Sequence, residues 1–203
     1  MTGSGQVTGV TGPAVDVTVA TADAMRALGR RLAGLLQAGD LVILIGGLGA
    51  GKTTLVQGIG EGLGVRGPVT SPTFVIARIH PSLTGGPDLV HADAYRLASP
   101  AEVDDLDLDE AMDSSVTVVE WGGGLAEGLA TDRLEITITP AEADVPVIGD
   151  RVVEDTVDGG NGADRAGDPD DPTVDVPRTV RISAVGERWE GIKLPLASLA
   201  NRL

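Results

Sequence analysis

The segment Gly46–Thr53 constrains this chain more than any other, because it fits the pattern G-x-x-x-x-G-K-[ST] of a phosphate-binding loop. The apolar run Leu41–Ile45 precedes it and predicts a buried parallel strand, and residues 53–63 can follow as a helix. Glycines let backbone N–H groups wrap around phosphate oxygens, and the helix N-terminus adds partial positive charge. We therefore predict that Lys52 reaches the β- and γ-phosphates of a nucleotide and that the Thr53 hydroxyl holds Mg²⁺.

A chance glycine-rich turn is the alternative, since the chain has 29 glycines. Lysine usage argues against it, because the chain's lysines are Lys52 and Lys193 alone and one of them stands where the motif requires it.

The length of 203 residues suits one α/β domain, and the 42% of hydrophobic residues is enough for a sizeable core. Aromatic residues make up only 2%, so Val, Leu, Ile and Ala must fill that core.

The acidic charge of the chain is concentrated in one stretch. Residues 141–177 hold 11 acidic residues against two arginines, a net charge of −9 out of −15 for the whole chain. The remainder is also acidic, so we expect no direct DNA binding, and contact with RNA only through a partner. The absence of cysteine excludes disulfides, and two histidines argue against zinc. With no leader and no apolar run near 18 residues, we expect a cytoplasmic protein without membrane contact.

Composition divides the chain into four regions. We expect a flexible N-terminus over 1–14, a P-loop ATPase domain over 15–139, an acidic disordered insertion over 140–177, and C-terminal strands over 178–203 that complete the same domain. The predicted fold class is α/β: a P-loop NTPase fold with a mostly parallel central sheet, flanking helices and added antiparallel strands.

Periodicity places further elements around the P-loop. We predict strands at Val15–Val19, Phe74–Ile79, Leu89–Ala92, Val116–Val119 and Leu134–Ile138, and a C-terminal hairpin from 178–183 and 188–194. Thr21 can cap a helix that carries Met25, Leu28, Leu32, Leu35 and Leu36 on one face. Ser99-Pro100-Ala101-Glu102 forms a capping box that starts a helix reaching Met112.

Several polar residues follow the predicted strands, where ligands bind in open α/β sheets. Glu120 is our candidate for holding Mg²⁺ and Asp93 for a role near the nucleotide, against the alternatives of ordinary hydrogen bonding, capping or an ion pair with Arg96. Ser71 and Thr73 lie where P-loop hydrolases keep a segment that senses the γ-phosphate, although Ser-Pro-Thr is also a common turn. From sequence alone, we interpret His91 as structural.

The nucleotide is expected to be ATP, because the guanine-reading motif N-K-x-D needs a lysine that this chain does not offer. The motifs together resemble the TsaE family, small P-loop ATPases of bacterial tRNA threonylcarbamoyladenosine synthesis. The resemblance covers roughly residues 15–139 and rests on four motifs in order: Gly49-Ala50-Gly51-Lys52-Thr53-Thr54, Ser71-Pro72-Thr73-Phe74, His91-Ala92-Asp93-Ala94-Tyr95-Arg96-Leu97 and Glu120-Trp121.

The resemblance implies ATP and Mg²⁺ as cofactors, and hydrolysis that is slow without the TsaB and TsaD partners. These partners place a threonylcarbamoyl group on adenosine 37 of tRNA, with TsaD as the transferase. It also implies catalytic roles for Lys52, Asp93 and Glu120, and metal binding by Thr53 and Glu120. Nucleotide contacts are implied for Gly49, Ala50, Gly51, Lys52, Thr53, Thr54, Ser71, Thr73 and Trp121.

Two departures from the family pattern are visible: Gly47 stands where an acidic residue is common, and the acidic insertion is unusual.

Two other functional classes also use a P-loop. A small-molecule kinase should carry an Arg-rich lid, whereas the segment in that region is acidic and has only Arg151 and Arg165. A non-catalytic nucleotide sensor would share the whole motif set, and single-turnover hydrolysis would separate it from an ATPase.

Overall fold

The computed structural model describes residues 14–141, 176–192 and 194. Most of the expected flexible N-terminus, residues 142–175 of the acidic insertion and residues 195–203 lie outside the described residues. Within the described ranges, no helix combines the length and the apolar character needed to cross a lipid bilayer.

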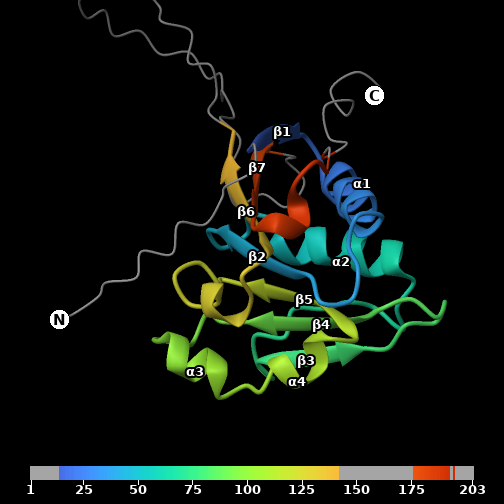
Figure 1. Ribbon diagram of the computed structural model, residues 1–203. Helices are drawn as coiled ribbons and strands as arrows, with labels where there is room; N and C mark the ends of the chain where they lie inside the picture. Colours follow the sequence, from blue (N-terminus) through green and yellow to red (C-terminus); the bar gives the residue numbers. More distant parts are fainter. Residues whose placement is uncertain (1–13, 142–175, 193, 195–203) are drawn as a thin grey trace, which may run out of the picture.

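Seven strands form one sheet in the order β1-β7-β6-β2-β5-β4-β3 (Figure 1). Their bounds are Val15–Val19 (β1), Leu41–Gly46 (β2), Ala77–His80 (β3), Asp88–Asp93 (β4), Ser115–Glu120 (β5), Arg133–Pro140 (β6) and Arg178–Val185 (β7). The central strands β6, β2, β5 and β4 pair in parallel. At one edge β3 pairs antiparallel with β4, and at the other β7 pairs antiparallel with both β6 and β1. This arrangement confirms the predicted α/β fold class.

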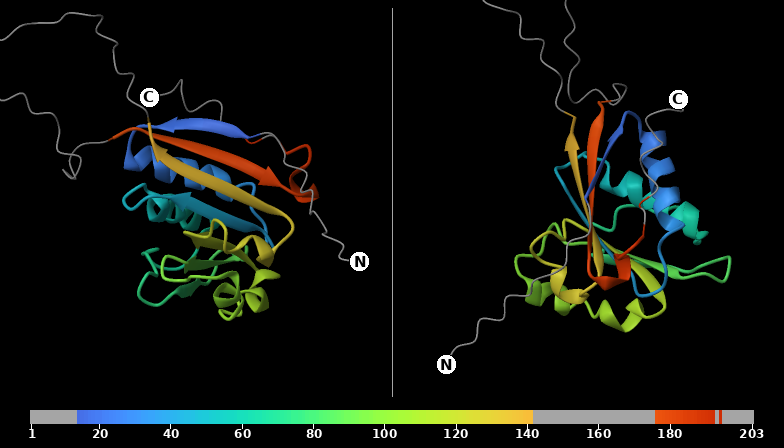
Figure 2. Two further views of the ribbon diagram at one scale, coloured as in Figure 1. Left: turned by 90° about the vertical axis from the view of Figure 1, so that its left-hand side faces the viewer. Right: turned by 45° about the horizontal axis from the view of Figure 1, so that its top comes forward.

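One face of the sheet is covered by α1 (Ala22–Ala33) and α2 (Lys52–Leu63), which lie behind β1, β7, β6 and β2 in the left view of Figure 2. As predicted, Thr21 caps α1: its Oγ1 accepts the N–H of Ala24 at 3.1 Å. Arg30 and Arg31 in the last turn complement the helix dipole. Leu28 and Leu32 are buried against the sheet, in agreement with the predicted apolar face.

Glycines let the two helices approach closely. A Cβ at Gly29 would lie 2.4 Å from the Leu55 oxygen, and a Cβ at Gly58 would lie 2.2 Å from the Arg26 oxygen. Glycine in a helix costs about 0.5–1 kcal/mol relative to alanine, so this pairing trades helix propensity for close packing. The contact fixes α2, and with it the end of the P-loop, against α1.

The other face is covered by two short helices, α3 (Pro100–Asp104) and α4 (Asp109–Met112), and by the 3₁₀ turn η1 (Glu127–Leu129). The capping box at Ser99 is confirmed, but a single helix reaching Met112 is wrong, because Asp107 has a φ of 49°. A continuous helix would turn Leu108 well away from Val103. The break lets both side chains enter the core beside Met112.

Two other predicted elements differ from the structure. The strand expected at Phe74–Ile79 begins only at Ala77, because the Pro72 oxygen accepts the N–H groups of Val75 and Ile76 and so closes a turn. The C-terminal hairpin is also wrong: β7 pairs with β6 and β1, and the 3₁₀ turn η2 (Glu187–Trp189) follows it. This turn buries Trp189 in the core between the sheet and α1.

The parallel strands β2, β5 and β4 bring three chain segments together where their carboxyl ends meet. In the pairing register, Asp93 at the end of β4 lies opposite Glu120 at the end of β5, and Glu120 lies opposite Leu44 of β2. The P-loop leaves β2 two residues later, so both carboxylates face the start of α2.

Candidate active site

The P-loop is shaped by glycines and closed by Lys52. Gly49 and Gly51 have φ values of 72° and 104°, a backbone conformation that other residues rarely adopt. The Lys52 Nζ donates hydrogen bonds to the Gly46 and Gly47 oxygens, both at 2.8 Å. A Cβ at Gly46 would lie 2.7 Å from the Ile138 oxygen, whereas one at Gly47 would meet nothing within 4 Å. The loop can therefore accommodate Gly47 or a larger residue there.

Lys52 is 95% buried beneath the aromatic ring of Trp121, whose centroid lies 3.7 Å from Nζ. Burial lowers the pKa of Lys52, while the carboxylates of Glu120 and Asp93 act in the opposite direction. Trp121 has a φ of 60°, which is unusual for a large side chain and places strain at the residue after Glu120. With this backbone conformation, the indole of Trp121 lies over the ammonium group of Lys52.

Glu120 is held by two donors on one oxygen. Its Oε1 accepts the Thr53 hydroxyl at 2.8 Å and lies 2.8 Å from His91 Nε2. Thr53 and Glu120 thus lie in direct contact, as a shared metal site requires. A hydroxyl and a carboxylate are hard oxygen donors of the kind that Mg²⁺ prefers.

Asp93 anchors the segment that follows α2. Its Oδ2 accepts the Thr73 hydroxyl, and its Oδ1 accepts the N–H of Tyr95 at 2.9 Å. Because the Thr73 proton is used in this way, the 2.7 Å contact between Ser71 and Thr73 has Ser71 as its donor. The segment also contains Ile76 with a φ of 69°, a strained value for a β-branched residue. Asp93 therefore holds a segment with stored backbone strain.

These groups line one open pocket of about 340 Å³. The structure brings together every site residue predicted from the sequence, and adds Leu48 at the rim: Leu48, Gly49, Ala50, Gly51, Lys52, Thr53, Thr54, Ser71, Thr73, Asp93, Glu120 and Trp121. Within the described residues, no cluster of three or more His, Cys, Asp or Glu side chains could hold a metal by itself. Mg²⁺ fits such a site nonetheless, because it takes one or two protein ligands and completes its shell with phosphates and water.

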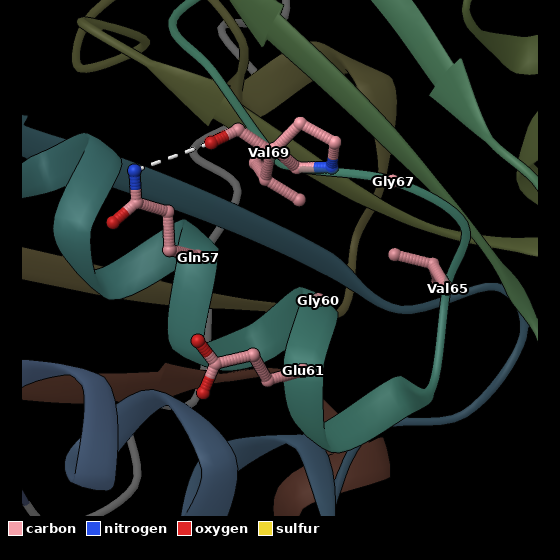
Figure 3. Close-up of a pocket in the computed structure, with 7 residues that line it drawn as sticks. Gln57, Gly60, Glu61, Val65, Gly67 and Val69 are labelled. Carbon is pink, nitrogen blue, oxygen red and sulfur yellow. Dashed lines mark hydrogen bonds between the residues drawn. The ribbon is translucent and has the colours of Figure 1, made fainter.

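A second cavity, of about 210 Å³, lies beside α2 and the loop after it (Figure 3). Gln57 lines this cavity, and its Nε2 donates to the Val69 oxygen at 3.2 Å. Glu61, also in the lining, pairs with Arg30 of α1 at 2.6 Å. None of the predicted site residues lines it. The hydrogen bond from Gln57 to Val69 fixes the chain two residues before Ser71, the first residue of the segment that contacts Asp93.

Sequence reasoning missed two contacts at the P-loop pocket. His91 contacts Glu120, and the guanidinium of Arg178 lies with Nη2 3.5 Å from the Gly49 oxygen. Strand alternation was an available signal for His91, because it lies two residues before Asp93 and so shares its face of β4. Arg178 had no such signal, since its position depends on β7 returning beside β6 after the acidic stretch.

The family of the chain follows from comparison with known proteins. The family model described as "Threonylcarbamoyl adenosine biosynthesis protein TsaE" matches residues 19–147. The chain belongs to the TsaE family. This confirms the resemblance that four motifs indicated.

Individual TsaE proteins resemble the chain over most of its length. A Streptomyces coelicolor protein named tRNA threonylcarbamoyladenosine biosynthesis protein TsaE is 54% identical over 166 residues, which cover 81% of this chain and 93% of that protein. A Bacillus subtilis protein of the same name is 40% identical over 120 residues, covering 59% of this chain and 73% of that protein. The crystal structure of Bacillus subtilis YdiB matches with a TM-score of 0.58 and 28% identity, covering 88% of this chain and 90% of that chain.

Proposed function

We propose that this chain is the ATPase subunit required for threonylcarbamoylation of adenosine 37 in tRNA, acting with homologues of TsaB and TsaD. The observation that carries the proposal is the contact of Thr53 with Glu120 beside the buried ammonium of Lys52, all in one pocket with the P-loop. The names of the related proteins support the pathway. In this proposal the chain hydrolyses ATP and is not itself the transferase.

The P-loop side binds the nucleotide. Backbone N–H groups from Gly49 to Thr54 surround the phosphates, and Lys52 leaves the Gly46 and Gly47 oxygens to meet the β- and γ-phosphates. Thr53 and Glu120 would hold Mg²⁺, which neutralises phosphate charge as the bond to the γ-phosphate breaks. Trp121 covers the ammonium and excludes water from that side of the phosphates.

The opposite side positions the groups around the γ-phosphate. In this proposal Asp93 lies near the hydrolytic centre, where its Oδ2 accepts the Thr73 hydroxyl and, at 3.5 Å, the Ser71 hydroxyl. Only one backbone bond, from the Asp93 N–H to the Ile76 oxygen, adds to these side-chain contacts. Such a segment can be rearranged by a phosphate or by a partner protein, because few bonds need to be exchanged. We propose that Ser71 and Thr73 sense the nucleotide state for this reason.

The charge of the protein fits a subunit role. With a net charge of −15, the chain is not expected to bind tRNA or DNA directly, so tRNA meets it only within the complex. Slow hydrolysis by the isolated protein is expected where no arginine from a partner completes the transition-state charge, an effect of about 10³–10⁵ in other P-loop enzymes. A cytoplasmic location is part of the same proposal.

We further propose that residues 15–139 and 178–203 form a single ATPase domain interrupted by the acidic insertion 140–177. The position of β7 between β1 and β6 supports this arrangement. ATP is proposed over GTP because the guanine-reading motif N-K-x-D needs a lysine. The chain's two lysines lie in the P-loop (Lys52) and in Ile192-Lys193-Leu194, so the motif is absent.

The test is ATP hydrolysis by the purified protein alone, then with the TsaB–TsaD pair and tRNA. The Lys52→Ala protein, prepared identically, measures any contaminating ATPase. We expect slow turnover that rises when the pair is added. Turnover that ignores the pair but responds to a small-molecule acceptor would indicate a kinase, and nucleotide binding without any turnover would indicate a sensor; either result overturns the proposal.

A further inference from the structure

His91 lies in the middle of β4 with none of its surface exposed to solvent. Its Nε2 is 2.8 Å from Glu120 Oε1, and its Nδ1 has no hydrogen-bond partner among the described residues. A buried ring nitrogen without a partner costs stability, so an apolar side chain would serve the core better at this position. The contact with Glu120 is the feature that an apolar residue could not provide.

The direction of this hydrogen bond follows from chemistry. A carboxylate can only accept, so His91 Nε2 carries the proton and donates it to Oε1. The Thr53 hydroxyl donates to the same oxygen. Two donors from different elements, β4 and α2, fix the plane of the carboxylate, while no hydrogen bond of the described residues goes to Glu120 Oε2.

We propose that His91 is a positioning residue that keeps the Glu120 carboxylate aimed at Thr53, so that both oxygens stay in place when the Thr53 hydroxyl turns to a metal. The proposal rests on the proposed Mg²⁺ and ATP site. Residues that orient a metal-binding side chain typically change metal affinity or activity by about 10–100-fold when they are replaced. His91 itself does not line the nucleotide pocket and is not exposed to solvent, so it can act on the pocket only through Glu120.

His80 on the neighbouring strand β3 is a matched control. It is also buried, at 4% exposure, and its Nε2 also has no partner in the described part of the chain. Its Nδ1 lies 3.4 Å from the Arg66 oxygen, away from the P-loop pocket. Replacing His80 therefore reports what the loss of a buried histidine does to this fold in general.

The experiment compares His91→Leu, His91→Gln and His80→Leu with the wild type. We expect His91→Leu to raise the Mg²⁺ concentration for half-maximal ATP hydrolysis by about tenfold or more, with ATP affinity in the absence of Mg²⁺ unchanged. His91→Gln should restore the Mg²⁺ requirement, because its amide N–H can donate to Glu120. His80→Leu should leave that requirement as in the wild type. Equal Mg²⁺ requirements in His91→Leu and His80→Leu would overturn the proposal.

A second readout needs no activity. In the isolated protein, ¹⁵N spectra of the imidazole groups should show His91 protonated at Nε2, with a signal that shifts in Glu120→Leu and not in His80→Leu. An Nδ1-protonated ring, or a signal indifferent to Glu120, would overturn the positioning role even if the protein hydrolyses ATP. A wild type that binds no ATP while this ring signal appears as expected would instead remove the proposed function and leave the contact established.

Discussion

The two sides of the pocket are built differently. The P-loop side is fixed by backbone: Gly49 and Gly51 set the turn, Lys52 bonds to two carbonyl oxygens, and α2 is packed against α1 through glycines. In the facing segment, residues 71–76, the hydroxyls of Ser71 and Thr73 contact the Asp93 carboxylate, and one backbone bond joins the Asp93 N–H to the Ile76 oxygen. Its Phe74 is 86% exposed. The difference suggests a division of labour, in which the fixed side binds nucleotide and the hydroxyl-held side adjusts to nucleotide and partner.

Removing the cation from the fixed side should have the largest effect. In Lys52→Ala the phosphates lose a charged hydrogen-bond donor, an interaction of up to about 3 kcal/mol, so ATP affinity should fall by about 100-fold and hydrolysis should vanish. Because burial disfavours the ammonium, as its lowered pKa indicates, the melting temperature should not fall. Calorimetric titration with ATP and a thermal melt measure the two outcomes; unchanged ATPase would refute the site assignment.

Neutralising the carboxylate between the two sides should separate binding from turnover. We expect Glu120→Gln to lower turnover by about 100-fold while ATP affinity changes only a few-fold, because phosphate oxygens also hold Mg²⁺. The glutamine oxygen can still accept from Thr53 and His91, so the fold should persist. Steady-state kinetics and nucleotide titration on one preparation decide this. Parallel losses of affinity and turnover with a lower melting temperature would point to a structural role.

The close packing behind the P-loop can be tested by stability. In Gly58→Ala the new methyl group meets the Arg26 backbone, so we expect a loss of about 1–3 kcal/mol in the free energy of unfolding despite the better helix propensity of alanine. Gly128→Ala is the control, because a Cβ there meets nothing within 4 Å. Urea denaturation of both variants measures the difference. A Gly58→Ala protein as stable as the control would show that α1 and α2 are not tightly packed.

A smaller effect is expected on the hydroxyl-held side. Thr73→Val keeps the shape but removes the bond to Asp93, a loss of about 1.5 kcal/mol that corresponds to about tenfold in rate. We expect partner-stimulated turnover to fall by this factor, with ATP affinity unchanged. Thr70→Val is the matched control, since the Thr70 hydroxyl contacts Arg78 and not Asp93. Equal turnover in the two variants would show that the bond to Asp93 has no role.

The smallest effect should come from removing the acidic stretch. Pro140 and Arg178 are register partners, and the Ala141 N–H donates to the Pro177 oxygen at 2.8 Å, so four residues can bridge the ends of β6 and β7. Replacing residues 142–175 by such a turn should leave ATP affinity unchanged and raise the free energy of unfolding by up to about 2 kcal/mol through loop entropy. A melting transition that collapses in the shortened chain would contradict the proposed single domain.

The sequence predicts the parallel core and the pocket well, because local patterns encode them. The P-loop motif fixes a strand, a turn and a helix together, and the polar residues Asp93 and Glu120 end apolar runs that must be strands. Because these strands are parallel, their carboxyl ends lie at the same end of the sheet, so both carboxylates are expected near the P-loop.

The elements that local patterns did not predict depend on tertiary contacts. Residues 74–76 have strand composition, but the Pro72 oxygen accepts the N–H groups of Val75 and Ile76 and closes a turn. Residues 188–194 alternate like a strand, yet burial of Trp189 and the ion pair of Arg188 with Asp40 favour a 3₁₀ turn. Strand alternation places His91 on the same face of β4 as Asp93, but its contact with Glu120 also depends on the pairing of β4 with β5.

The division of labour is tested most directly by measuring two quantities on Lys52→Ala and Thr73→Val in parallel. Equilibrium titration with a slowly hydrolysed ATP analogue gives affinity, and single-turnover hydrolysis with the TsaB–TsaD pair gives the rate. The account predicts that Lys52→Ala loses affinity, whereas Thr73→Val keeps wild-type affinity and loses rate. Loss of affinity in Thr73→Val comparable to that in Lys52→Ala would contradict it.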